Sequence, residues 1–219
     1  MFGVRVIGQA WSWHDSAPSQ SVPTASPSLS EPVHHLATPR VLSIAAERYQ
    51  SAPVFSDYLT SVVNNKDWWM AAYKTASVST THIERARALA MPWRLLALSE
   101  DWCGDAVNIL PYVARLADAT PETLELRVLD RDANPDLMDA HLTGRSRSIP
   151  LILALDANLV ERGWWGPRPS DLQKQAMGEW WTLPKDERRL RLRTWYARDR
   201  GRQILEEVLL LLEAAGRRG

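Results

Sequence analysis

Apolar and polar residues change their spacing along this chain, and each spacing predicts a different kind of element. Between residues 54 and 90 the apolar residues recur every three or four positions, which indicates helices. Thr81 and Glu84 fit a capping box at the start of one of these helices. The charged stretch from 184 to about 215 is also predicted to be helical, with Gly201 as a candidate break.

The middle of the chain alternates between short apolar runs and helical stretches. In one run Leu124, Leu126 and Val128 lie on the same side, which is the pattern of a strand. Strands are predicted over residues 93–99, 124–130, 150–156 and 159–165. Helices are predicted over residues 106–117, 134–142 and 168–181. The turn sequence at 156–158 joins the last two strands, so we expect them to form a hairpin.

The order of these elements predicts an α/β domain with a mixed sheet, β-α-β-α-β-β-α, and extra helices at both ends. The first β-α-β unit requires a parallel pair with a right-handed crossover, whereas the hairpin is antiparallel. We therefore expect four segments along the chain. They are a leader over 1–50, a helical segment over 51–92, the α/β domain over 93–182 and a helical extension over 183–219.

The leader prediction depends on composition. Residues 14–40 are rich in Ser, Pro and Thr, so they offer little apolar surface to offset the entropy of an ordered chain. We expect this segment to be disordered. His34 and His35 follow it, and we expect both to be solvated rather than bound to a metal.

Charge and cysteine content exclude several classes of protein. The chain has 26 basic residues (Lys and Arg) and 26 acidic residues (Asp and Glu), so its formal net charge is zero. A neutral chain has no general electrostatic attraction to nucleic acid or anionic membranes. A single cysteine excludes internal disulfides and any multi-cysteine metal site made by this chain alone. The single cysteine suits a reducing compartment, so we expect the cytoplasm. We expect no membrane span, because no run of about 18 apolar residues occurs.

That cysteine lies in a motif that resembles the thioredoxin superfamily. Trp102-Cys103-Gly104 follows a predicted buried strand and begins a helix, as the first half of the W-C-G-P-C motif does. The further points of likeness are Pro111 inside that helix, the 130–135 segment, Ile149-Pro150 before the next strand and Gly166 after the hairpin. The resemblance implies the thioredoxin fold, with Pro150 as the cis-proline that faces Cys103.

The chain departs from the family pattern at three positions. Asp105 stands where thioredoxin has proline, and Ala106 stands where it has the second, resolving cysteine. Ala97 occupies the position of the buried acid. Dithiol reductase chemistry needs a second thiol, so the resemblance does not extend to that reaction.

Three interpretations of Cys103 remain open from the sequence. It could be the catalytic thiol of a monothiol oxidoreductase, with no bound cofactor and with glutathione or another small thiol as reductant. The domain could instead bind protein partners in a groove beside Ile149 and Pro150, with Trp102, Gly104 and Asp105 shaping the site. Cys103 could also simply be a small packed side chain. We expect partner proteins with thiols or disulfides, and the oligomeric state stays undetermined.

Opposing charges act on this thiol. A helix N-terminus favours a thiolate, whereas Glu100, Asp101 and Asp105 oppose it. Arg145 and Arg147 precede Ile149 and could approach in space. Asp105 is also suited to stabilise its own helix as an acid of the first turn.

Two other segments suggest binding, but we favour structural roles for both. The Trp- and Pro-rich stretch 163–169 could form a rim near Pro150, yet such clusters more often pack against their own core. Arginines interleave with Trp195 and Tyr196 over 188–202, which could suit nucleic acid. Nearby acids favour a solvated helix face instead. His82 and His141 lack metal-ligand spacing.

Overall fold

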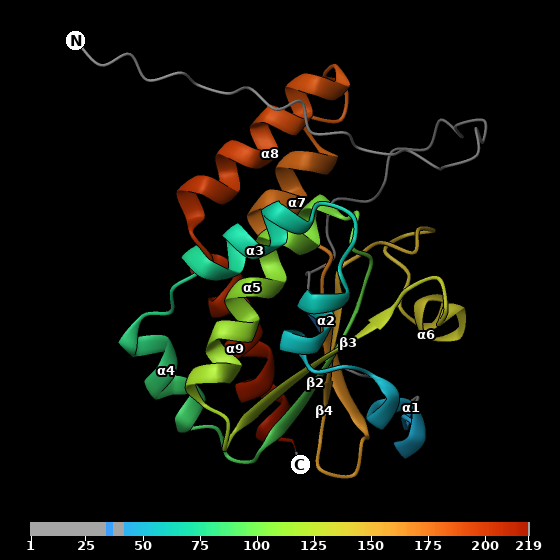
Figure 1. Ribbon diagram of the computed structural model, residues 1–219, viewed down its shortest axis with the longest axis vertical. Helices are drawn as coiled ribbons and strands as arrows, with labels where there is room; N and C mark the ends of the chain where they lie inside the picture. Colours follow the sequence, from blue (N-terminus) through green and yellow to red (C-terminus); the bar gives the residue numbers. More distant parts are fainter. Residues whose placement is uncertain (1–33, 37–41, 219) are drawn as a thin grey trace.

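A five-stranded mixed sheet forms the centre of the protein. The structure, a computed structural model, describes residues 34–36 and 42–218 (Figure 1). The strand order is β1-β5-β4-β2-β3, and only β2 and β3 are parallel among the paired strands. The strands are β1 (His34–Leu36), β2 (Trp93–Ser99), β3 (Leu124–Asp130), β4 (Leu151–Leu155) and β5 (Glu161–Trp165). The predicted strands, parallel pair and hairpin are confirmed.

Helices cover both faces of this sheet. In Figure 1, α5 and α9 lie on one side of the sheet and α6 lies on the other. The helices are α1 (Ala46–Ser51), α2 (Phe55–Ser61), α3 (Lys66–Thr75), α4 (Thr80–Arg87), α5 (Gly104–Ala119), α6 (Pro135–Ala140), α7 (Ser170–Met177), α8 (Lys185–Asp199) and α9 (Arg202–Gly216). No helix in the described ranges is long and apolar enough to cross a bilayer.

The core joins the central strands to both α5 and α9. Val107, Leu110 and Ala114, which share one predicted face of α5, are all buried. Helix α9 contacts β5, β1, α4 and α5, and it buries most of its apolar side chains there. Burying a leucine side chain contributes about 2 kcal/mol each, so the C-terminal helix is a substantial part of the core.

The chain before residue 51 only partly fits the predicted leader. Most of 1–50 lies outside the described residues, but β1 and the start of α1 belong to the ordered chain. The leader prediction is therefore wrong for these two pieces. The reason is tertiary: β1 adds to the edge strand β5 through its backbone, which composition cannot indicate.

The opposite edge of the sheet is covered by the segment between α1 and α2. Val128 donates its backbone N–H to the carbonyl of Pro53, 3.0 Å away, and Val54 forms a bridge with Arg127. These contacts shield the outer side of β3 from pairing with another chain. The N-terminal segment therefore protects the edge of the sheet.

Candidate functional site

Cys103 lies at the point where β2 gives way to α5. It is the N-cap residue of α5, and its own carbonyl accepts the N–H of Val107. Its side chain faces Ile149, whose carbonyl accepts the thiol hydrogen over 3.5 Å. The Ile149–Pro150 peptide bond is cis. The strand–helix junction and the loop before β4 thus bring the thiol against a backbone carbonyl.

Burial decides the protonation of this thiol. Cys103 is only 7% exposed. Burial raises the pKa of Cys103 to about 12, and the charge of Asp105 acts in the same direction. The N–H groups of Ala106 and Asp105 and the positive charge of Arg168 oppose that rise but are outweighed. Cys103 is therefore a protonated thiol at neutral pH, and the helix N-terminus does not prevail.

Asp105 holds together a partly buried polar cluster, made with Arg168 and Tyr196, beside the thiol. It lies in the first turn of α5, as expected. Its Oδ2 forms an ion pair with Arg168 over 2.6 Å, and its Oδ1 accepts the hydroxyl of Tyr196 over 2.8 Å. Burial and the nearby Asp105 carboxylate raise the pKa of Tyr196 well above its ordinary value. The hydroxyl thus stays neutral and remains a donor to Asp105.

A pocket of about 250 Å³ opens at the thiol. Its lining residues are Trp102, Cys103, Gly104, Asp105, Arg131, Arg147, Ser148, Ile149, Pro167 and Arg168. The pocket thus brings together the motif residues and Ile149. Pro150 is not part of the lining; it lies buried beside Gly166, where any Cβ would collide with the Pro150 carbonyl.

Three arginines line this pocket, but each has a carboxylate partner. Arg168 pairs with Asp105, Arg147 with Asp139 and Arg131 with Asp132. The Arg131 guanidinium also lies 5.0 Å from the centre of the Trp102 ring. Arg147 therefore reaches the pocket as the sequence suggested, whereas Arg145 is not among the lining residues.

The loop before Cys103 is fixed by the N-terminal helical segment. The carboxylate of Asp101 accepts the backbone N–H groups of Val63 and Asn64, and its carbonyl accepts the indole N–H of Trp69. Asp101 thus serves as a structural acceptor. This contact gives the segment before β2 a direct role in placing Trp102 and Cys103.

The Trp-rich segment after β5 packs more than it exposes. Trp165 is fully buried and donates its indole N–H to Glu207. The ring of Trp164 lies edge-on to the ring of His141, with centroids 5.6 Å apart. The packing interpretation is correct for Trp165. Within the described residues, no cluster of three or more His, Cys, Asp or Glu could hold a metal.

Two important residues of the site, Arg168 and Tyr196, could not be recognised from the sequence. Tyr196 lies 91 positions from Asp105, so no local pattern connects them. Arg168 falls inside the segment singled out for its tryptophans, and Tyr196 falls inside the basic helix. Arg168 and Tyr196 can be assigned to the site only from the fold, which places both of them against the partly buried carboxylate of Asp105.

Comparison with known proteins identifies the family. A family described as thioredoxin matches residues 52–186. The chain belongs to the thioredoxin family. The fold agrees with this assignment, since a mixed sheet carries the Trp102–Asp105 motif at the start of α5. The comparison with curated proteins gives no match.

Two solved structures share the fold of this thioredoxin-family chain. A protein of unknown function from Pseudomonas aeruginosa has a TM-score of 0.62 and 20% identity, and the match covers 80% of this chain and 99% of that one. An HIV epitope-scaffold protein has a TM-score of 0.59 and 20% identity, with 77% and 97% covered. At this identity the likeness concerns the fold alone.

Proposed function

We propose that this protein is a monothiol thiol–disulfide oxidoreductase in which Cys103 exchanges one disulfide bond with a protein partner. The observation that supports this most directly is the thiol at the N-cap of α5, 3.5 Å from the Ile149 carbonyl and open to a pocket. The single cysteine suits a reducing compartment, and we propose the cytoplasm.

The partner would bind as an extended strand beside Ile149. A backbone N–H of that strand would donate a hydrogen bond to the Ile149 carbonyl and replace the one from the Cys103 thiol. The thiol of Cys103 would then no longer be hydrogen-bonded to Ile149. Cys103 then gives its proton to solvent, and its thiolate attacks one sulfur of the partner disulfide. A mixed disulfide forms, and the other partner sulfur leaves as a thiolate.

A second thiol from outside the chain would complete the exchange, because Cys103 is the only cysteine. Glutathione thiolate would attack the partner sulfur of the mixed disulfide. A glutathione–partner disulfide forms, and Cys103 leaves as a thiolate and regains its proton. No cofactor needs to remain bound.

Incubation of the folded protein with glutathione disulfide at alkaline pH tests this proposal. Intact-mass measurement should show one glutathione adduct on the wild type, and reduced glutathione should remove it. Cys103→Ser supplies the matched control, because it keeps the shape and lacks the thiol. An adduct that forms only after unfolding in urea would contradict the proposal.

The raised pKa of Cys103 favours a second candidate, a thioredoxin-fold binding module without thiol chemistry. In that case the groove beside Ile149 would hold partner segments while Cys103 stays protonated. Equal affinity of wild type and Cys103→Ser for peptides selected on the wild type would favour this candidate. Loss of binding in Cys103→Ser would favour thiol exchange.

A further inference from the structure

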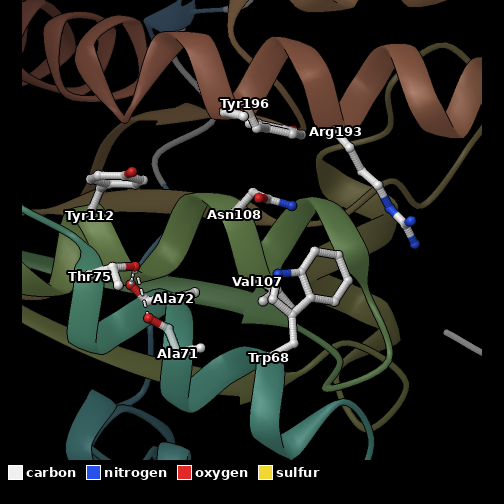
Figure 2. Close-up of a pocket in the computed structure, with 10 residues that line it drawn as sticks. Trp68, Ala71, Ala72, Thr75, Val107, Asn108, Tyr112, Arg193 and Tyr196 are labelled. Carbon is white, nitrogen blue, oxygen red and sulfur yellow. Dashed lines mark hydrogen bonds between the residues drawn. The ribbon is translucent and has the colours of Figure 1, made fainter. Parts of the chain in front are cut away.

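A second cleft, of about 380 Å³, lies between α3, α5 and α8 and shares no lining residue with the thiol pocket. Figure 2 shows Tyr112 at one end of this cleft and Trp68 with Arg193 at the other. Asn108 of α5 lies between them, and Tyr196 of α8 lies opposite. This volume is in the range of small-molecule sites, which begin at about 300 Å³.

The walls of the cleft suit a flat aromatic group. Trp68 and Tyr112 contribute aromatic rings, and rings of this kind favour stacked or edge-on contact with another ring. Ala71, Ala72 and Ala197 also line the cleft. These short side chains keep the space open, and a longer residue at any of the three positions would fill it.

The charged group in the lining of the cleft favours an anionic ligand. Arg193 is the only charged residue among those that line it, and no lining residue is a carboxylate. Arg193 is exposed and forms no ion pair within the described part of the chain. Guanidinium groups bind carboxylates through two parallel hydrogen bonds, so Arg193 can recognise an acid group.

We propose that this cleft binds a small aromatic carboxylate, with the ring between Trp68 and Tyr112 and the carboxylate on Arg193. The occupant would also contact Tyr196, whose hydroxyl donates to Asp105 of α5. A ligand here therefore touches a residue that is hydrogen-bonded to the cluster beside Cys103. The binding step itself requires no thiol chemistry.

Calorimetric titration with 2-naphthoate and its neutral analogue 2-naphthamide tests the proposal. We expect the wild type to bind naphthoate at least about tenfold more tightly than the amide, because only the acid forms charge-assisted hydrogen bonds with Arg193. Arg193→Gln should remove this preference. Arg198→Gln, an exposed arginine of α8 outside the cleft, should keep it.

Two further variants show whether the probe occupies this cleft and whether binding depends on the thiol. Ala71→Leu, at an exposed position of α3, should abolish binding of both probes by filling the cleft. Cys103→Ser should bind naphthoate as the wild type does, so a failure of the thiol chemistry would leave this result untouched. Three results would overturn the proposal. The first is that naphthoate shows no saturable binding to the wild type, and the second is that the amide binds equally well. The third is that naphthoate binds Arg193→Gln and Ala71→Leu as tightly as it binds the wild type.

Discussion

The reactivity of Cys103 depends on how neighbouring charges cancel. Arg168 is the cation best placed to stabilise a thiolate, but its ion pair with Asp105 offsets much of its charge. Backbone N–H groups at the start of α5 remain, and burial outweighs them. Burial therefore keeps the thiol neutral, and the charge of Asp105 adds to that effect.

Tyr196→Phe tests the partly buried hydrogen bond from Tyr196 to Asp105. The variant removes the donor to Asp105 and leaves a half-satisfied carboxylate, so we expect a loss of about 1 kcal/mol in the free energy of unfolding. Tyr112→Phe is the matched control, since that hydroxyl has no hydrogen bond to a described residue. Urea denaturation measures both, and equal effects would contradict the assigned role.

Sequence reasoning reached the motif but not its surroundings. Trp102, Cys103, Gly104 and Asp105 are contiguous and follow a recognisable strand, so their placement at one site was predictable. The pocket also needs groups from distant parts of the chain, and those depend on packing. The sequence also could not show whether burial or the helix N-terminus controls the pKa of the thiol, because burial is a property of the folded state.

Helices and strands differed in how far local patterns determined them. The central strands were predicted almost to the residue, because their apolar runs are bounded by turn residues. The prediction of a capping box at Thr81 and Glu84 is wrong. Ser79 is the N-cap of α4, and its hydroxyl accepts the N–H of His82. Strand β1 was missed, because its pairing with β5 is set by backbone contacts between distant segments.

Gly201 joins α8 to α9 in a conformation that only glycine adopts readily. Its φ is +79°, and a Cβ there would collide with the ring of Tyr112. We expect Gly201→Ala to lower the free energy of unfolding by about 2 kcal/mol or more, from backbone strain plus the collision. Gly144→Ala is the control, because Gly144 has φ +63° but open space around it.

Thermal or urea unfolding of the two alanine variants separates strain from collision. Gly144→Ala should cost about 1 kcal/mol from the backbone alone. If Gly201→Ala costs no more than Gly144→Ala, the ring of Tyr112 does not pack tightly against the α8–α9 junction.

His141 links α6 to β5 and makes stability depend on pH. Its Nδ1 lies 2.6 Å from the Leu137 carbonyl and its Nε2 lies 2.9 Å from the Glu161 carboxylate, so both nitrogens face acceptors. Burial disfavours the imidazolium, but the hydrogen bond and charge of Glu161 prevail and raise the pKa of His141. A raised folded-state pKa stabilises the fold fully below the unfolded value of 6.5.

We therefore expect the free energy of unfolding to fall as pH rises from 6.5 through the raised pKa of His141. Urea denaturation across this range, on wild type and His141→Gln, measures the contribution. The variant should lose this part of the pH dependence. A wild type that becomes more stable over the same range relative to His141→Gln would contradict the charged histidine.

At the scale of the whole molecule, the helices before β2 and after β5 are part of the packed fold. The segment before β2 holds Asp101 and covers the edge of β3. Helix α9 packs against β5 and places Glu207 in the core, where it accepts hydrogen bonds from Trp165, Ser170 and Gln203. Both ends of the described chain are thus tied to the sheet that carries the site.

Glu207→Gln tests the anchoring of α9. Both carboxylate oxygens accept hydrogen bonds only, so whichever oxygen becomes an amide NH₂ will face a donor. We expect a loss of about 2 kcal/mol in the free energy of unfolding. Glu206→Gln changes a partly buried carboxylate that pairs with Arg85. Because the amide oxygen can still accept from Arg85, this control should cost less than about 1 kcal/mol. Comparable losses in chemical denaturation would contradict the anchoring role of Glu207.

The pH dependence of Cys103 alkylation in the folded protein decides whether the fold holds this thiol neutral. A thiol whose pKa is held near 12 should react slowly at neutral pH, and its rate should keep rising well above the ordinary cysteine pKa of about 8.5. The same chain unfolded in urea should react faster at neutral pH. A folded-state apparent pKa below about 8.5 would contradict the buried, neutral thiol and show that the N-terminus of α5 outweighs burial.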